Sequence, residues 1–205
     1  PQLIDTLAWE QIEAGGSSAS FRKDARLENY AGNNFSMLLE RRVDLLDDRQ
    51  TIELLGMELP DGVDCVAFRS ENKITNTGDY EWNRHTGMPS IWVLGQFIPS
   101  MDNTIIIPVK QAAGERINDA YFCKIPADRL RSENKVLYVK GDGRMRGKIG
   151  TPPAMPVPVC GAIDRQNGTL TGVRFSFDPA KADYVNSMWE QQAEPYRGDV
   201  INSYN

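Results

Sequence analysis

The chain is a series of short extended runs in which apolar and polar residues alternate, separated by turns rich in Gly, Pro, Asn and Asp. Residues 19–30 place apolar side chains on one face and charged side chains on the other, and a period of two is typical of a strand with one solvated face. A turn at 32–34 leads into a second alternating run at 35–46. These two runs predict a β-hairpin with long arms.

The same pattern predicts further strands at 63–74, 90–98, 104–109, 135–140, 144–149, 159–163 and 170–177. An Asp-Gly turn at 142–143 predicts a tight hairpin between the runs on either side of it. Asp47 and Asp48 could cap a short helical turn over residues 49–57, and a strand at 51–55 is almost as good an interpretation. No stretch predicts a long amphipathic helix. The pattern indicates an all-β, antiparallel sandwich, which we expect to form one domain over residues 1–205.

Residues 72–107 stand out because they set polar chemistry beside apolar surface. A strand ends near residue 74, a polar loop follows, and the apolar run 90–98 leads through a turn into the strand at 104–109. The polar loop carries the only histidine of the chain, His85, together with Trp82. We therefore expect this stretch to form the centre of the fold and the rim of a site.

Composition narrows the class of protein. With 40% hydrophobic and 25% charged residues the chain can bury a core, and its net charge of −5 argues against a nucleic-acid partner. No apolar run is long enough to predict a membrane span, and no signal peptide is visible. The chain begins at Pro1 without a methionine and ends without a charged tail, so we expect a fragment of a longer chain.

Metal and cofactor chemistry finds little support in the sequence. The three cysteines lack metal-ligand spacing, and we expect buried free thiols. A single histidine excludes a histidine-rich zinc site. No nucleotide-binding, zinc-protease or G-x-S-x-G motif occurs, so no metal and no cofactor is predicted.

Three cations follow one another at alternate positions. Arg144, Arg146 and Lys148 would share one face of a strand, where they could bind an acidic sugar, a sulfate or a phosphate. The structural alternative, which we favour, is that the three cations lie on a solvated sheet face and pair with nearby carboxylates.

Aromatic and titratable residues give further candidates. Trp92 lies in an apolar run, which favours core packing over a ligand-binding role. Trp82 and Trp189 lie among polar residues, where a platform for sugar stacking and a structural plug are equally good interpretations. His85 could act as an acid or base, although a lone loop histidine is more often a surface residue. Glu190 could act as a base or accept hydrogen bonds from sugar hydroxyls.

Four strings carry a family resemblance: ENKITNTG (71–78), TGMPSIWVLGQFIPS (86–100), VLYVKGDGRMRGKIG (136–150) and YVNSMWEQQAEPYRGDVINSYN (184–205). From about residue 21 to residue 205 the chain resembles an uncharacterised bacterial family, abundant in gut carbohydrate degraders, whose members look like galactose mutarotases (aldose 1-epimerases) in fold. The resemblance implies a β-supersandwich, of which this chain is the central to C-terminal part. It also implies a concave carbohydrate-binding surface and a periplasmic or secreted location, which the residues themselves leave unknown.

Mutarotases open the sugar ring with a glutamate base and a histidine acid. The stretch that corresponds to the first of their histidines reads Met-Pro-Ser-Ile-Trp at 88–92, without a histidine, and His85 lies in the loop before it. The resemblance therefore implies sugar recognition more directly than mutarotase activity.

Three functions stay open at this point. The leading one is a carbohydrate-recognising protein of a glycan-utilisation system, without required epimerase activity. The second is a sugar-active epimerase, lyase or hydrolase that uses His85, Glu190 or Arg144. The third is a structural module that self-associates or is completed by a missing segment.

Overall fold

The computed structural model describes residues 3, 6–110, 117–119, 121–178, 180, 183–188 and 191–205. Contacts between Cα atoms divide the chain into two compact units, Pro1–Trp92 and Val93–Asn205, which we describe one at a time. The expectation that residues 1–205 form a single sandwich domain concerns how the two units combine, and it stays a prediction.

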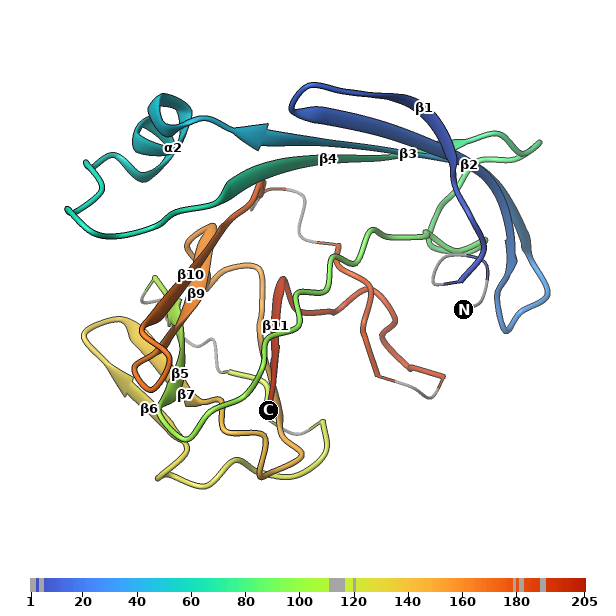
Figure 1. The fold of residues 1–205 in the computed structure, drawn as a ribbon. Helices are drawn as coiled ribbons and strands as arrows, with labels where there is room; N and C mark the ends of the chain where they lie inside the picture. The colour runs from blue at the N-terminus through green and yellow to red at the C-terminus, as the bar shows by residue number, and fades with distance from the viewer. Residues whose placement is uncertain are drawn as a thin grey trace. The chain divides into compact units, whose positions relative to one another are not determined.

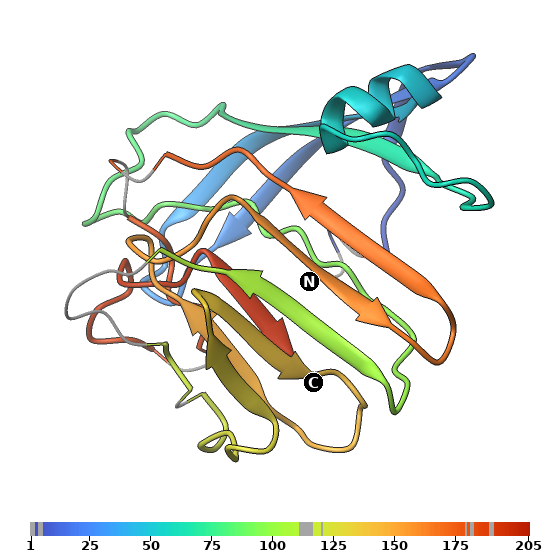
Figure 2. The same cartoon turned by 90° about the vertical axis from the view of Figure 1, so that its left-hand side faces the viewer.

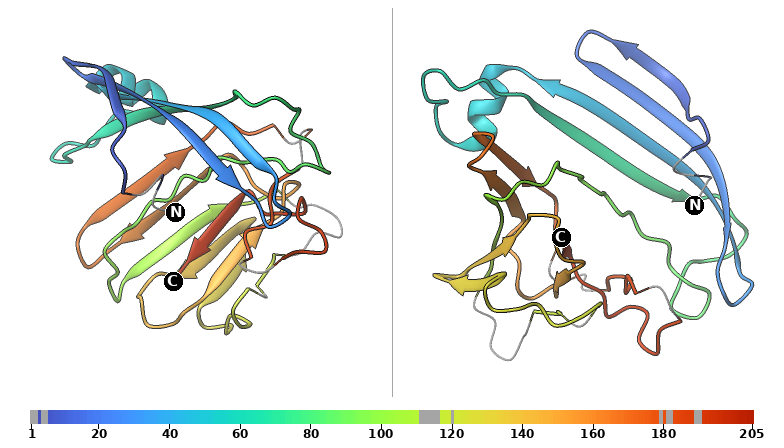
Figure 3. Two further views of the ribbon diagram at one scale, coloured as in Figure 1. Left: turned by 90° about the vertical axis from the view of Figure 1, so that its right-hand side faces the viewer. Right: turned by 60° about the horizontal axis from the view of Figure 1, so that its bottom comes forward.

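The first unit is one antiparallel sheet of long strands. Its strands lie in the order β1-β2-β3-β4 (Figure 1, and right-hand view of Figure 3). They are β1 (Glu10–Gly15), β2 (Ser18–Glu28), β3 (Asn34–Leu46) and β4 (Ala67–Asn76). The predicted hairpin is confirmed, because β2 pairs with β3 from Ser18↔Asp44 to Glu28↔Asn34. β4 begins at residue 67, later than the alternation from 63 predicts.

One face of this sheet is apolar over half its length. Phe35, Met37 and Leu39 of β3 are buried there. Trp82 packs on Phe35 edge to face, with 6.1 Å between the ring centroids. At the other end of the same face Leu45 and its cross-strand partner Phe68 are exposed. That exposed pair is what a self-associating module would need, and self-association stays a prediction.

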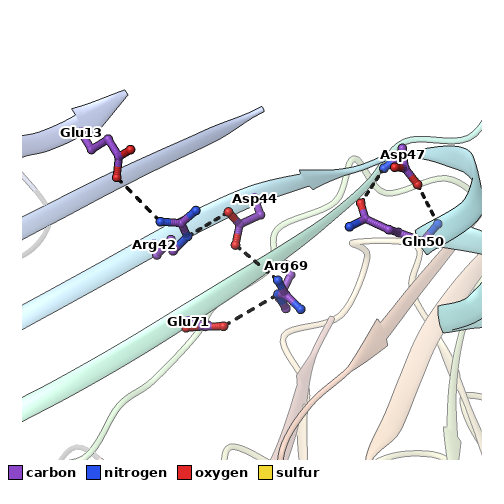
Figure 4. A network of polar contacts seen from close by, with 7 residues as sticks. All are labelled: Glu13, Arg42, Asp44, Asp47, Gln50, Arg69 and Glu71. Atoms are coloured by element: carbon purple, nitrogen blue, oxygen red, sulfur yellow. Dashed lines mark hydrogen bonds and ion pairs between the residues drawn. The ribbon is translucent and has the colours of Figure 1, made fainter. Parts of the chain in front are cut away.

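The opposite face carries a ladder of ion pairs across three strands (Figure 4). Its members are Glu13 of β1, Arg42 and Asp44 of β3, and Arg69 and Glu71 of β4. The shortest contact, Arg42 Nε to Asp44 Oδ1, is 2.9 Å, and the others are 3.7–3.8 Å. Except for Asp44, whose side chain is 15% exposed, these side chains are largely solvated, and surface pairs contribute about 1 kcal/mol or less each. The ladder therefore marks a mostly solvated face.

A short helix, α2 (Asp48–Leu55), lies between β3 and β4. Of the two alternatives for this stretch, a helical turn and a strand, the helix is therefore confirmed. The Asp47 side chain accepts a hydrogen bond from the Gln50 backbone N–H at 2.8 Å. In return the Gln50 side chain accepts one from the Asp47 N–H at 3.0 Å, as Figure 4 shows. This reciprocal capping box satisfies donors that the first helical turn cannot pair internally.

Replacing Asp47 by alanine is expected to lower the free energy of unfolding by about 1 kcal/mol, because the cap acceptor is lost. Urea denaturation followed by circular dichroism measures the effect. Asp48→Ala is the matched control: it removes a first-turn carboxylate that lies near the helix N-terminus without capping it, and is expected to cost about half as much. Equal costs for the two variants would contradict the capping role.

The second unit contains a five-stranded sheet and a two-stranded sheet, both antiparallel. The larger sheet has the order β10-β9-β5-β7-β6 and the smaller one pairs β11 with β8 (Figure 2). Their bounds are β5 (Asn103–Pro108), β6 (Leu130–Glu133), β7 (Val136–Lys140), β8 (Lys148–Thr151), β9 (Val159–Asp164), β10 (Thr169–Arg174) and β11 (Ile201–Tyr204). The predicted all-β, antiparallel class is confirmed, and the described strands close no barrel.

The core of the second unit follows from the same alternation. Ile107 of β5 lies opposite Leu137 of β7, and both are almost fully buried. Ile149 of β8 and Ile201 of β11 extend this core. The left-hand view of Figure 3 shows β5 and β11 from the opposite side to Figure 2.

Two strand predictions are wrong. Residues 90–98 form no strand, and Trp92 and Ile98 are 49% and 86% exposed, so Trp92 is not a core residue. The Asp-Gly turn at 142–143 does not join two paired strands, because β8 begins only at Lys148 and pairs with β11. The Asp142 side chain is instead buried under Arg129.

Of the remaining structural predictions, one hairpin is confirmed and the burial of two cysteines is wrong. The hairpin of β9 and β10 across residues 164–168 is confirmed. Burial of the free thiols is wrong for Cys65 and Cys123, which are exposed, while Cys160 is half-buried. Among the described residues, none of the helices has the length and apolar character needed to cross a membrane.

Candidate functional site

Two of the predicted site residues, Trp82 and His85, lie in the first unit, and they have different surroundings. Trp82 is half-buried and packs on the core residue Phe35, which fits the structural interpretation. His85 is exposed in a turn where the Asn83 side chain accepts hydrogen bonds from the backbone N–H groups of His85 and Thr86, at 2.8 and 3.1 Å. The structure thus places the histidine at the surface, in the first unit.

The three predicted cations do not line up side by side. Arg144 is exposed, and its backbone N–H donates to Asp142. Arg146 lays its guanidinium 4.4 Å over the Phe122 ring. Lys148 turns inward and is only 2% exposed. The other two predicted residues, Trp189 and Glu190, lie outside the described residues.

Lys148 is the centre of a polar group that we name the Lys148 cluster: Lys148, Ser187, Tyr121, Asp199 and Asn202. The pairing of β8 with β11 assembles part of it. Lys148 lies opposite Tyr204 and Gly150 lies opposite Asn202, so these four residues share one face, while Ile149 and Ile201 face the core. The alternation that buries the isoleucines therefore points the lysine toward the cluster.

Asp199 reaches the cluster from the segment just before β11. Its carboxylate Oδ2 accepts hydrogen bonds from the Tyr121 hydroxyl and from Asn118 Nδ2, the latter at 3.1 Å. A Cβ at position 150 would overlap that carboxylate, so the glycine in β8 makes room for it. Asn118 joins the opposite edge of β8 through two backbone hydrogen bonds with Gly150, at 2.8 and 2.9 Å.

The Lys148 ammonium group has polar and aromatic neighbours. Nζ donates to Ser187 Oγ at 2.6 Å, and it lies 3.7 Å from the centre of the Tyr121 ring and 5.0 Å from that of Tyr204. Burial lowers the pKa of Lys148 to about 8, against the opposing attraction of the Asp199 carboxylate. About a tenth of the side chains are therefore neutral at pH 7, so that this lysine can exchange a proton near neutrality.

Tyr121 and Ser187 are the hydroxyl-bearing side chains of the cluster. Burial, and then its hydrogen bond to Asp199, raise the pKa of Tyr121 well above its ordinary value, so its hydroxyl stays a donor. Ser187 Oγ hydrogen bonds to Asn202 Oδ1 at 3.3 Å, and Ser187 is half-buried. The cluster thus holds a hydroxyl between a lysine and an amide, beside a protonated phenol.

An open hollow of the second unit lies on the segment that leads to Ser187. It is lined by Ser176, Phe177, Asp178 and Tyr184, and we name it the Phe177 hollow. The Phe177 and Tyr184 rings are 6.2 Å apart and inclined at 48°. Burial, and then the charge of Asp178, raise the pKa of Tyr184. The hollow thus offers aromatic faces together with a carboxylate and a hydroxyl.

The hollow and the cluster share one short piece of chain. Tyr184 and Ser187 are three residues apart, so their Cα atoms lie within about 11 Å. The carbonyl of Tyr184 accepts a hydrogen bond from Gly198 N–H at 2.7 Å, and Gly198 directly precedes Asp199. Within the second unit the two features are therefore coupled through residues 184–187 and 198–199.

The whole chain, residues 1–205, matches the model of a protein family described as "Family of unknown function (DUF6786)". The chain belongs to this family. No curated protein and no solved structure gives a significant match. Membership in DUF6786 therefore brings no activity with it, and the galactose mutarotase resemblance gains nothing from these comparisons.

Sequence reasoning missed most of the Lys148 cluster in this DUF6786 chain. Tyr121 reads as an apolar anchor, and Ser187 and Asp199 carry no local signal. Its one sequence signal was Lys148 itself, the last of the three alternate cations. For the Phe177 hollow the usable signal is the alternation of Phe175 and Phe177, whose ring centroids lie 6.4 Å apart beside Tyr184. No group of three or more His, Cys, Asp or Glu residues in the described part of the chain could hold a metal ion.

Proposed function

We propose that the chain binds a carbohydrate, and that the Phe177 hollow is where the sugar ring is held. The aromatic pair Phe177 and Tyr184 carries this proposal. Sugar rings present C–H groups of slight positive charge, which are attracted to the negative faces of aromatic rings. A second support is the resemblance of the four sequence strings to an uncharacterised family that looks like galactose mutarotases in fold, which implies a carbohydrate ligand.

The polar lining of the hollow suits hydroxyl groups. Asp178 is a pure acceptor when ionised, and Ser176 can donate or accept, so together they match the donor and acceptor character of a hydroxyl. Ligand sites commonly combine apolar faces with a few such polar groups. The open form of the hollow fits the end or side of a glycan better than a small molecule that must be enclosed.

A glycan array with neutral and acidic saccharides, followed by titration calorimetry on each hit, tests this function. We expect at least one hit, and we expect Phe177→Ala to weaken binding about tenfold, because a lost ring contact costs roughly 1 kcal/mol or more.

The matched control is Phe97→Ala, which removes an exposed phenylalanine ring of the same unit outside the hollow, whereas Phe177 is half-buried. It should leave the affinity unchanged. An array without hits, or equal affinities for Phe177→Ala and the unchanged protein, would rule out a carbohydrate site in the hollow.

A further inference from the structure

We propose that Ser187 is a nucleophile activated by Lys148, and that the chain hydrolyses an ester carried by its carbohydrate ligand. The ester chemistry depends on the Lys148 cluster alone; the assignment of the alcohol part as a sugar rests on the proposed carbohydrate binding.

The geometry of the pair is that of a nucleophile and its base. Ser187 Oγ and Lys148 Nζ are 2.6 Å apart, within direct proton-transfer reach. With Lys148 protonated, Ser187 Oγ accepts from Lys148 and donates its own proton to Asn202 Oδ1 at 3.3 Å. When Lys148 is neutral, the hydroxyl can rotate and turn its proton to the amine. A serine is unreactive at its ordinary pKa, and it needs an adjacent group that can take its proton.

The surroundings of Lys148 supply such a base. The side chain is 2% exposed and lies against two tyrosine rings, and this burial disfavours the ammonium form. Because the pKa of Lys148 is lowered to about 8, the neutral amine is present at neutral pH. An ordinary surface lysine would hold its proton too tightly to serve.

Tyr121 gives the cluster a donor for developing negative charge. Its hydroxyl donates to Asp199 in this structure. A phenol that stays protonated can turn to an oxyanion formed on the carbon that Ser187 attacks. Until that step Asp199, which also accepts from Asn118, holds the phenol beside Lys148.

The reaction balances without a cofactor. Ser187 Oγ bonds to the ester carbon while its proton passes to the neutral Lys148 Nζ. The ester C–O bond then breaks, and the Lys148 ammonium returns the proton to the leaving sugar alcohol. Water adds to the acyl-serine, Lys148 takes a proton from it and gives it back to Ser187 Oγ, and the free acid leaves.

A fluorophosphonate probe tests the nucleophile without knowledge of the substrate. An activated serine displaces fluoride from the probe, and mass spectrometry locates the adduct. We expect one adduct, on Ser187, formed at a rate that rises with pH and levels off above a midpoint near pH 8, as Lys148 loses its proton. Ser187→Ala and Lys148→Arg should each lose the adduct, since an arginine stays protonated.

Ser132→Ala is the matched control, because it removes an exposed serine hydroxyl of β6 in the same unit, outside both the Phe177 hollow and the Lys148 cluster, and it should label like the unchanged protein. Circular dichroism establishes that each variant is folded. If Lys148→Arg is misfolded, the role of Lys148 is judged from the unchanged protein, by whether its labelling rate levels off with a midpoint near pH 8. No adduct on Ser187, a rate that keeps rising with pH without a plateau, or equal labelling of a folded Lys148→Arg overturns the proposal.

The two proposals fail separately. Phe177→Ala should lose glycan affinity and keep fluorophosphonate labelling, whereas Ser187→Ala should keep glycan affinity and lose labelling. A labelled Ser187 without any glycan hit would leave an esterase of non-carbohydrate esters and remove the proposed function alone.

Discussion

Replacing Asp142 by alanine is expected to lower the free energy of unfolding by about 3 kcal/mol, one of the two largest effects of any single change considered. The Asp142 side chain is 1% exposed and accepts hydrogen bonds from Arg129 and from the Arg144 backbone N–H, while Lys140 Nζ lies 3.7 Å away. Removing a buried carboxylate leaves the cation that it neutralised, which costs more than the pair contributes. Arg129 would be that cation, and its Nε has no hydrogen-bond partner among the described residues even now.

Urea denaturation measures the loss, and Glu133→Ala is the matched control. Glu133 pairs with Arg131 at 2.9 Å, but both side chains are more than half exposed, so this deletion is expected to cost under about 1 kcal/mol. A similar cost for the two variants would mean that burial adds nothing to the Asp142 interactions.

The same carboxylate gives stability a dependence on acid pH. The hydrogen bond from Arg129, more than any other contact, holds the pKa of Asp142 well below its ordinary value. The unfolded chain therefore binds a proton where the folded one does not, and the stabilisation is complete above about pH 4 and lost as pH falls below it. Asp142→Asn should lack this part of the acid-induced loss.

Local patterns predicted the local parts of this fold. The two-residue period at 19–30 and 35–46 gave a hairpin because the partner strands follow each other in the chain. Asp47 was predicted to cap a helical turn because a cap and the turn it serves are adjacent in the chain, and the structure adds Gln50, three residues on, as its reciprocal partner. Such features need no information from distant sequence, so a single chain reveals them.

The strand and hairpin predictions that failed depend on contacts with distant parts of the chain. The run at 144–149 reads as the partner of 135–140, but β8 finds its partner in β11, more than 50 residues later. The Asp-Gly dipeptide predicts a tight hairpin from local turn preference alone, but here Asp142 is buried under Arg129 and β8 begins only at Lys148. The apolar run 90–98 resembles a strand, yet no strand pairs with it.

The Lys148 cluster is held together by contacts between residues that are far apart in the sequence. Ser187 and Lys148 are 39 residues apart, and Tyr121 and Asp199 are 78 apart. Neither a motif nor a period connects residues at such distances. Lys148 was noticed as one of three alternate cations, but only the pairing with β11 shows that it turns inward while Arg144 and Arg146 stay outside.

Gly198→Ala is the second large effect, with an expected loss of about 2–4 kcal/mol in the free energy of unfolding. A Cβ at this position would overlap the carbonyl of Val185, and it would also crowd the carbonyl of Tyr184, to which Gly198 N–H donates. Both obstacles are backbone atoms, so no side chain can rotate away. The segment that carries Tyr184 and Ser187 must move instead.

Gly172→Ala is the matched control, since no atom lies within 4 Å of the added methyl group and the residue is in a strand of the same unit. Alanine there restricts the unfolded chain and is expected to be neutral or slightly stabilising. Because Gly198 also directly precedes Asp199, its alanine variant should lose both glycan affinity and Ser187 labelling. Equal stability of the two variants, measured by urea denaturation, would mean that the approach of residues 184–185 to Gly198 is not required, and that the hollow and the Lys148 cluster are held in place by something else.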